Sequence, residues 1–158
     1  MEEYGELLEV KIKMDKVFLA HSSIDKEGYI NEVANILKQN IGINNIVYDS
    51  FSFDMSYSIE EQIKESLKNT SIFILFLSPN SILSEWVEFE LEEAIKLYSD
   101  NIKVICAINI YDINLENYIS NVINDRVEYV IRDAREPIEA VAIIEEIFQN
   151  VVTITKSG

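Results

Sequence analysis

The segment 72–77 (IFILFL) is apolar at every one of its six positions. A run of this length with no polar residue is typical of a strand that helices cover on both faces, as in a parallel sheet. It is also far too short for a membrane-spanning helix, which needs about 18 or more apolar residues. The segment therefore predicts the central strand of an α/β sheet.

Other apolar runs alternate with helical patterns on both sides of this segment. Gly42 is placed to end the first helix, and Ser58 and Glu61 have the spacing of a capping box that begins the second. Five strands that alternate with helices predict a flavodoxin-like three-layer α/β fold, with a five-stranded parallel sheet and helices on both faces. We expect strands at 17–20, 43–48, 72–77, 102–108 and 127–131, and helices at 26–40, from 58 onward with a buried stripe of Ile59, Ile63 and Leu67, at 84–98 and at 137–149.

The chain of 158 residues has the length of one ordinary domain. We expect that domain to occupy residues 16–150. Residues 1–15 would form an N-terminal extension, in which alternating apolar residues permit a strand and the first positions permit a helix. Residues 151–158 would form a C-terminal tail or a linker.

The charge of the chain argues against several kinds of partner. Thirteen basic and twenty-eight acidic residues give a net charge of -15. Nucleic acids and anionic membrane surfaces bind basic proteins, because basic side chains displace phosphate counterions. The sequence therefore predicts that neither nucleic acid nor a membrane is a direct partner.

Residue counts exclude further classes of site. One cysteine (Cys106) and one histidine (His21) are too few for a structural zinc site or a disulfide framework. The four glycines cannot form a Walker A loop or the dinucleotide-binding G-x-G-x-x-G motif. The acidic N-terminus is unlike a signal peptide, and a lone cysteine with apolar neighbours suits a reducing compartment, so we expect a cytoplasmic protein.

Ligands of open parallel sheets bind at the carboxyl ends of the strands, near the switch in strand order. The segments that follow the first three expected strands are therefore the candidate site. They are KVFLAHSSIDKE (16–27), VYDSFSFDMSYSIEEQI (47–63) and FLSPNSILSEWVEFEL (76–91). In the third segment, Trp86 and Glu90 lie four residues apart on one face of the expected helix.

Together these segments, in this order and at these separations, resemble the Toll/interleukin-1 receptor (TIR) domain, and its bacterial members in particular. The resemblance covers about residues 16–149. It implies one of two functions: cleavage of NAD+ between nicotinamide and ribose, or non-enzymatic pairing with other TIR domains as an adaptor. For the enzymatic function it implies NAD+ as the substrate, no further cofactor, and ADP-ribose or a cyclic ADP-ribose as the product. It also implies self-association, a role in antiviral defence, and a fused or separate sensor or effector protein as a partner.

The resemblance assigns roles to seven residues. Glu90 matches the essential glutamate that follows the family's tryptophan by four residues, and Trp86 matches that tryptophan. The loop after the first strand would contact the nucleotide, and the loop after the second would line the site. The substrate-binding residues implied in this way are His21, Ser22, Ser23, Asp49, Phe51 and Trp86.

Two departures from the family pattern affect these loops. Met55 and Ser56 stand where many members carry Pro-Gly, and Ser22 and Ser23 stand where some carry arginines. Contacts to phosphate would then come from hydroxyls and backbone N–H groups.

A single carboxylate suffices for this chemistry. The nicotinamide of NAD+ is a cationic leaving group that departs neutral, so no general acid is needed. The ribosyl cation that remains resembles the transition state of glycosidases, which a preorganised carboxylate stabilises electrostatically.

Each candidate also has a structural interpretation. Glu90 stands among other glutamates and would then belong to a solvated acidic helix face, while Trp86 would pack structurally in either case. His21 would be a strand-end residue bonded to backbone, Asp49 a turn residue, and Ser22 and Ser23 helix caps. Cys106 is interpreted as core packing.

Three other functions compete with the enzymatic one. The adaptor function is favoured by four apolar or aromatic side chains in one loop: Phe51, Phe53, Met55 and Tyr57. A phosphoacceptor receiver domain needs an aspartate where this chain has Ser78. A nucleoside deoxyribosyltransferase would also set a glutamate against a ribosyl cation.

Overall fold

A computed structural model describes residues 16–48, 58–111, 114, 116–123 and 126–157 of the chain. Its centre is a parallel sheet of five strands in the order β2-β1-β3-β4-β5. The strands are β1 (Lys16–Ala20), β2 (Ile46–Val47), β3 (Thr70–Leu77), β4 (Val104–Asn109) and β5 (Val130–Asp133). This order confirms the predicted flavodoxin-like α/β fold.

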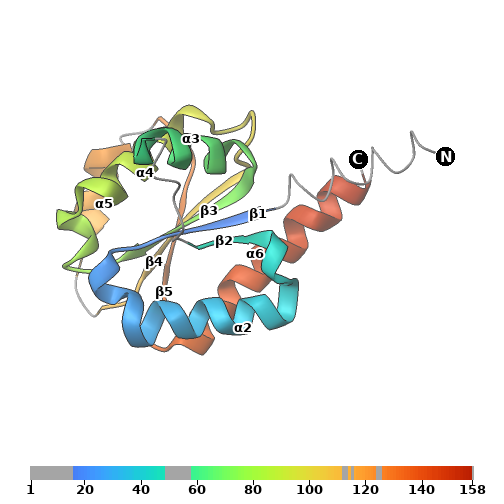
Figure 1. Cartoon of the computed structure of the whole chain (residues 1–158), viewed down its shortest axis with the longest axis horizontal. Helices are drawn as coiled ribbons and strands as arrows, with labels where there is room; N and C mark the ends of the chain where they lie inside the picture. Colours follow the sequence, from blue (N-terminus) through green and yellow to red (C-terminus); the bar gives the residue numbers. More distant parts are fainter. Residues whose placement is uncertain (1–15, 49–57, 112–113, 115, 124–125, 158) are drawn as a thin grey trace.

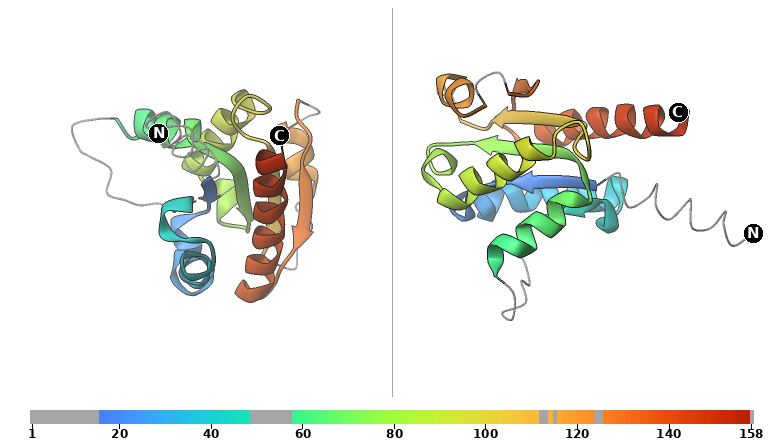
Figure 2. Two further views of the ribbon diagram at one scale, coloured as in Figure 1. Left: turned by 90° about the vertical axis from the view of Figure 1, so that its right-hand side faces the viewer. Right: turned by 90° about the horizontal axis from the view of Figure 1, so that it is seen from above.

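Helices cover both faces of the sheet (Figure 1). One face carries α2 (Asn31–Ile41) and α6 (Pro137–Ser157), and the other carries α3 (Ile59–Lys68), α4 (Glu85–Lys96) and α5 (Glu116–Ile123). The two perpendicular views show the sheet between these layers (Figure 2). None of the helices in the described part of the chain combines the length and the apolar character needed to cross a membrane.

The central strand β3 explains why two cores form. All eight of its residues are buried, and its side chains alternate between the two faces of the sheet. Ile72, Ile74 and Phe76 pack in the cluster with α2 and α6. Phe73 and Leu75 pack in the cluster with α3 and α4. The apolar run at 72–77 thus serves both faces of the sheet, as the sequence predicted.

The first predicted helix begins later than expected. Residues 26–30 form a separate turn, η2 (Lys26–Ile30), in which Glu27 is extended and Gly28 has a φ of 87°. Such a positive φ is favourable for glycine and interrupts an α-helix. The regular helix α2 therefore starts at Asn31 and, as predicted, ends before Gly42.

Several other element boundaries also differ. Strand β2 has two residues because residues 43–45 form a 3₁₀ turn after Gly42. Strand β5 begins at Val130, because Val127 and Tyr129 pack against the core from outside the sheet. The eight-residue helix α5 was not predicted, and α6 extends to Ser157, beyond the predicted end at 149.

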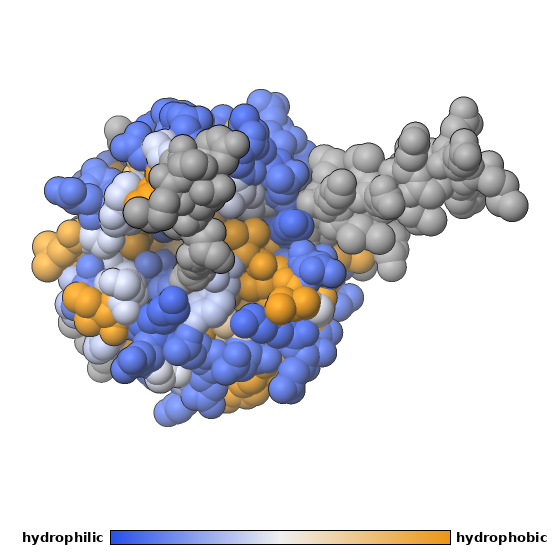
Figure 3. All heavy atoms as spheres, in the orientation of Figure 1, coloured by the Kyte–Doolittle hydropathy of each residue, from blue (hydrophilic) through white to orange (hydrophobic). Residues whose placement is uncertain are grey.

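The second predicted helix is confirmed at its start. Ser58 caps α3 by accepting a hydrogen bond from the backbone N–H of Glu61 at 3.1 Å. Ile63 and Leu67 are buried as predicted, whereas Ile59 is 43% exposed because it lies in the first turn, beyond the core. On the face of the molecule seen in Figure 3, apolar areas are interspersed with hydrophilic ones. The boundaries of the domain at 16 and 150 remain predictions.

Candidate functional site

The candidate site lies at the carboxyl ends of β1, β2 and β3, which meet at one edge because the strands are parallel. The loop after β1 holds His21, Ser22 and Ser23, and helix α4 after β3 holds Trp86 and Glu90. The structure thus places five of the seven predicted residues on elements that follow neighbouring strands. Asp49 and Phe51, like the other apolar residues of the 49–57 loop, lie outside the described residues.

The loop after β1 is held by bonds to its own backbone. Nδ1 of His21 donates a hydrogen bond to the carbonyl oxygen of Leu19 at 2.8 Å, which confirms the backbone contact predicted for this histidine. Ser22 is buried, and its hydroxyl accepts from the backbone N–H of Ile24 at 3.2 Å. Ser22 therefore caps the turn η1 (Ser23–Asp25), while the side chain of Ser23 is exposed. Nucleotide contacts by these residues remain predictions.

A buried polar cluster joins this loop to the loop after β3. Asp25 is only 6% exposed. Its carboxylate accepts hydrogen bonds from the hydroxyl of Ser78 and, at 2.9 Å, from the side-chain amide of Asn80. We call these three residues the Asp25 cluster. A buried carboxylate requires such donors, so the cluster fixes the two loops relative to each other.

Further hydrogen bonds connect the Asp25 cluster to the start of α4. The Ser78 hydroxyl accepts from the backbone N–H groups of Asn80 at 3.2 Å and Ser81 at 3.0 Å. The next turn, η4 (Ser81–Leu83), leads to Ser84, which caps α4 by accepting from the N–H of Val87 at 3.3 Å. The Asp25 cluster thus sets where α4 begins, and with it the position of Glu90.

Sequence reasoning missed this cluster. Ser78 served only to argue against a receiver domain, and no role was assigned to Asp25 or Asn80. The available signal was a Ser-Pro-Asn-Ser turn directly after the most apolar strand, together with an aspartate in the loop after the neighbouring strand.

Helix α4 places Glu90 at the border between core and solvent. Val87, Leu91, Ala94 and Ile95 form the buried stripe. Glu90 lies at the edge of this stripe and is half-buried. This side chain therefore occupies an environment less polar than bulk water, where a carboxylate interacts more strongly with a cation.

Trp86 does not pack in the core. Its indole is 48% exposed and meets the ring of Phe89 edge-on, with centroids 6.2 Å apart. Trp86 was expected to have a structural packing role in either case. In the structure, the ring contact with Phe89 is the part of that role that is observed. The exposed part of the indole is available for a planar ligand to stack on.

The neighbouring glutamates of α4 fall into two groups. The two carboxylate oxygens of Glu92 accept hydrogen bonds from the guanidinium group of Arg126, at 3.0 and 3.2 Å. The carboxylate of Glu93 forms an ion pair with Lys96 at 3.0 Å. Glu85 and Glu88 are exposed. The structural interpretation as a solvated acidic face therefore fits Glu85 and Glu88, whereas Glu92 and Glu93 are half-buried like Glu90.

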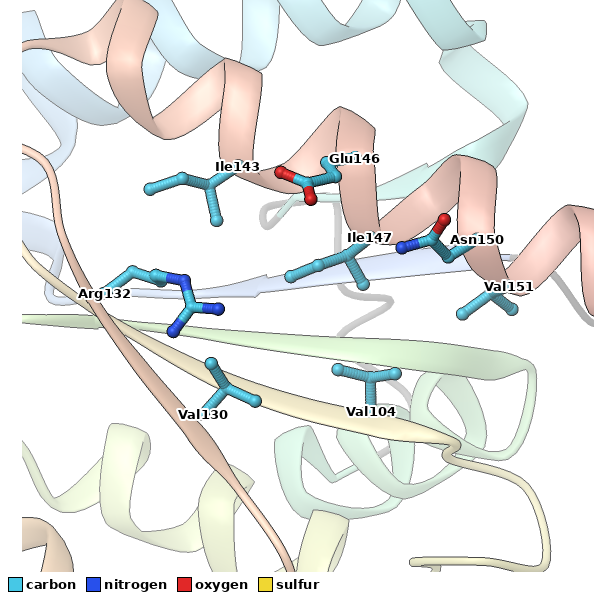
Figure 4. A pocket seen from close by; sticks show the side chains of 8 residues that line it. All are labelled: Val104, Val130, Arg132, Ile143, Glu146, Ile147, Asn150 and Val151. Atoms are coloured by element: carbon cyan, nitrogen blue, oxygen red, sulfur yellow. The ribbon is translucent and has the colours of Figure 1, made fainter.

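A separate hollow of about 270 Å³ lies at the other end of the sheet, under α6 (Figure 4). Val104 and Val130, the first residues of β4 and β5, point toward α6 across it. Its charged lining residues are Arg132 and Glu146. The other lining residues are Ile143, Ile147, Asn150 and Val151.

The described residues contain no group of three or more histidine, cysteine, aspartate or glutamate side chains that could hold a metal ion. Cys106 is fully buried in the core, and burial raises the pKa of its thiol from 9.0 to about 11. This agrees with the interpretation of Cys106 as a packing residue.

Comparison with known families gives a match to one family model, described as the TIR domain, over residues 17–139. This range includes both loops of the Asp25 cluster and all of α4. The TIR domains of the activated Roq1 resistosome share the fold, with a TM-score of 0.57 and 15% sequence identity over 86% of this chain and 98% of that one.

Two relatives of known name are more similar in sequence. The chain is 29% identical over 92 residues to the 2' cyclic ADP-D-ribose synthase AbTIR of Acinetobacter baumannii, covering 58% of this chain and 34% of the relative. It is 35% identical over 74 residues to the NAD(+) hydrolase TirS of Staphylococcus aureus, covering 47% of this chain and 26% of the relative. The chain thus spans about a third or less of the length of these curated relatives.

Proposed function

This chain belongs to the TIR domain family, and we propose that it cleaves the bond between nicotinamide and ribose in NAD+. The observation that carries the proposal is the position of Glu90, half-buried on α4 and one helical turn beyond the exposed indole of Trp86. The names of the two relatives, one for NAD+ hydrolysis and one for cyclic ADP-ribose synthesis, support it.

The proposed reaction begins when the bond between C1′ of the ribose and the pyridinium nitrogen breaks. Both bonding electrons move to that nitrogen, so nicotinamide leaves as a neutral molecule. Positive charge then develops on C1′ and the ring oxygen of the ribose. The carboxylate of Glu90 stabilises this charge, and its half-buried position strengthens the interaction.

The Trp86 indole and the Asp25 cluster have supporting roles in this proposal. Trp86 offers a flat apolar surface beside Glu90 on which a planar ring can stack. The Asp25 cluster holds the loops after β1 and β3 in a fixed arrangement before the substrate binds, which lowers the reorganisation cost of the reaction.

The fate of the ribosyl cation decides the product. Attack by water, with loss of one proton, gives ADP-ribose. Attack by a hydroxyl group of the same molecule, again with loss of one proton, gives a cyclic ADP-ribose. Both reactions share the first step proposed above, and product analysis separates them.

The test is the release of nicotinamide from NAD+ by concentrated protein, followed by chromatography. Glu90→Gln keeps the size of the side chain and removes its charge, so we expect the rate to fall by about 10²–10³. Glu88→Gln, an exposed position on the same helix, is the matched control and should retain the wild-type rate. No release by the wild-type protein, or equal release by the two variants, would overturn the proposal.

A second candidate function is self-association as an interaction module. Three large apolar side chains near the site favour it, because Leu83 is 83% exposed, Ile24 is 72% exposed and Trp86 is 48% exposed. Light scattering of Leu83→Asp beside wild type tests this function. Loss of oligomers in the variant, without NAD+ turnover in either protein, would favour it over the enzymatic one.

The antiviral role, the cytoplasmic location and a sensor or effector partner remain predictions from the sequence. Within the enzymatic proposal NAD+ is the substrate, and no further cofactor is invoked.

A further inference from the structure

Two lysines converge on the ring of Tyr48, the residue directly after β2. Nζ of Lys26 lies 5.6 Å from the centre of the ring, and Nζ of Lys38 lies 5.3 Å from it. The imidazole of His21 lies beside the same ring, with centroids 5.6 Å apart. All four side chains are half-buried. We call these four residues the Tyr48 cluster.

The fold creates this convergence from separate elements. Lys26 belongs to η2, Lys38 to the last turn of α2, and His21 to the loop after β1. The positive φ of Gly28 separates η2 from α2, so Lys26 does not lie on the α-helix that carries Lys38. The kink in the first helix therefore contributes to the position of Lys26.

The chain has a net charge of -15, yet only some of its described lysines lie against carboxylates. Lys64 and Lys96 pair with Glu61 and Glu93 of their own helix, whereas Lys103 bonds backbone carbonyls. Among the described residues, no carboxylate lies within ion-pair distance of Lys38, and its ammonium group is held by the Tyr48 ring instead. A half-buried cation without a carboxylate partner attracts an anion.

We propose that the Tyr48 cluster binds the pyrophosphate of a dinucleotide, with Lys26 and Lys38 supplying the positive charge. Both ammonium groups lie within 5.6 Å of the centre of one aromatic ring, so positive charge gathers around it and favours an anion. Lysine is a common phosphate ligand because its ammonium group acts as a point charge with three donors. The aromatic ring restrains both side chains and so lowers the entropy cost of binding.

The cluster lies on the α2 side of the sheet, where Tyr48 packs with α2 and α6, whereas α4, which carries Glu90, packs on the other face. His21 and Tyr48 follow the neighbouring strands β1 and β2, at the sheet edge where α4 begins after β3. The choice of a dinucleotide as the ligand rests on the proposed function, whereas the anion site rests on the cluster alone. An anion site at these two lysines would also explain how an acidic chain with serines at 22 and 23 holds a pyrophosphate.

The first experiment measures binding of inorganic pyrophosphate and of ADP-ribose by calorimetry at low ionic strength. Lys26→Met and Lys38→Met keep the length of the side chain and remove its charge, and each should weaken both affinities by about tenfold. Lys68→Met, an exposed position on α3, is the matched control and should leave both affinities unchanged. Lys26→Arg and Lys38→Arg keep the charge and should retain most of the affinity. Circular dichroism confirms that each variant is folded.

The second experiment measures NAD+ cleavage by the same variants. Because the pyrophosphate is unchanged during the reaction, its contacts act equally on substrate and transition state. The two methionine variants should therefore raise KM by about tenfold each and leave kcat nearly unchanged. Pyrophosphate should compete with NAD+ in the wild-type enzyme.

The outcomes separate this inference from the proposed function. Weaker pyrophosphate binding by the methionine variants supports the anion site, even if the protein releases no nicotinamide and the proposed function fails. Equal pyrophosphate binding by wild type and variants, or no binding by wild type, overturns the site. Nicotinamide release with an unchanged KM in both variants upholds the proposed function and overturns the assignment of the cluster to its substrate.

Discussion

The two ends of the sheet differ in what lines them. At the carboxyl end, buried polar groups bind one another between loops, as in the bonds of Asp25 to Ser78 and Asn80. At the amino end, a hollow of about 270 Å³ is lined mainly by aliphatic side chains of β4, β5 and α6. This hollow is thus lined by few groups that could perform chemistry. The buried polar groups at the carboxyl end are therefore the better indication of a functional site.

The largest expected effect is on the rate of NAD+ cleavage. It is tested by shortening one glutamate side chain at each end of the sheet. Glu90→Asp moves the charge back by one methylene, and such a displacement lowers the rate of NAD+ cleavage by about 10²-fold. Glu146→Asp makes the same change beside the hollow and should not alter the rate. Nicotinamide release under steady-state conditions measures both. A matching loss in the Glu146 variant would remove the functional distinction between the two ends.

The second largest effect concerns the stability of the carboxyl end. Asp25→Ala leaves the buried donors of Ser78 and Asn80 without their acceptor, and we expect a loss of about 2 kcal/mol in the free energy of unfolding. Asp133→Ala removes an exposed carboxylate from the end of β5 and should cost about 0.5 kcal/mol or less. Urea unfolding of both variants measures the difference. Similar losses would mean that the Asp25 cluster is not a special feature of this end.

The third prediction uses Cys106, on the α6 face of β4 between the two ends. Burial raises the pKa of its thiol from 9.0 to about 11, so above pH 9 the unfolded chain loses this proton while the folded chain keeps it. The free energy of unfolding should therefore fall between about pH 9 and pH 11, by about 1.4 kcal/mol for each unit of pH at most. Urea unfolding of wild type and Cys106→Val at pH 8 and pH 10 measures the contribution of the thiol.

The Cys106→Val variant is needed as a reference because burial also raises the pKa of Tyr29. Tyr29 therefore adds its own pH dependence to the free energy of unfolding at higher pH. The same thiol reports on opening of the α6 face, since Cys106 is fully buried in the core on that face. Rapid labelling of the folded protein, or an identical pH dependence in the variant, would contradict the prediction.

The smallest expected effect comes from filling the hollow. Val104→Ile adds one methylene group where there is space, and should raise the free energy of unfolding by up to about 0.8 kcal/mol without changing NAD+ cleavage. Ala20→Val, at the fully packed carboxyl end of β1, should instead destabilise the protein. Thermal unfolding measures both variants. Stabilisation by both would show that the two ends are equally loosely packed.

The fold was largely predictable because burial on both faces leaves a clear pattern in the sequence. The apolar run at 72–77, the glycine after α2 and the serine cap of α3 each reflect a local physical requirement, and all three appear in the structure. The errors occurred where a backbone detail interrupts a pattern. The positive φ of Gly28 moved the start of a helix, and apolar residues such as Val127 pack from a loop instead of a strand.

The candidate site was predictable only in part. Glu90 and Trp86 were found through their spacing and a family resemblance, and the structure adds their different exposure. Asp25 was missed because its partners lie 53 and 55 residues away in the sequence. Lys26 and Lys38 were missed for the same reason, since their meeting point at Tyr48 exists only in the folded chain.

The lengths of the two outer strands have a consequence for assembly. Strand β2 has two residues and β5 has four, so each described border of the sheet offers few backbone groups to an incoming chain. Copies of this protein would therefore associate through side-chain surfaces, and they would not extend the sheet from one molecule to the next. A domain proposed to self-associate thus has outer strands too short to template amyloid-like stacking.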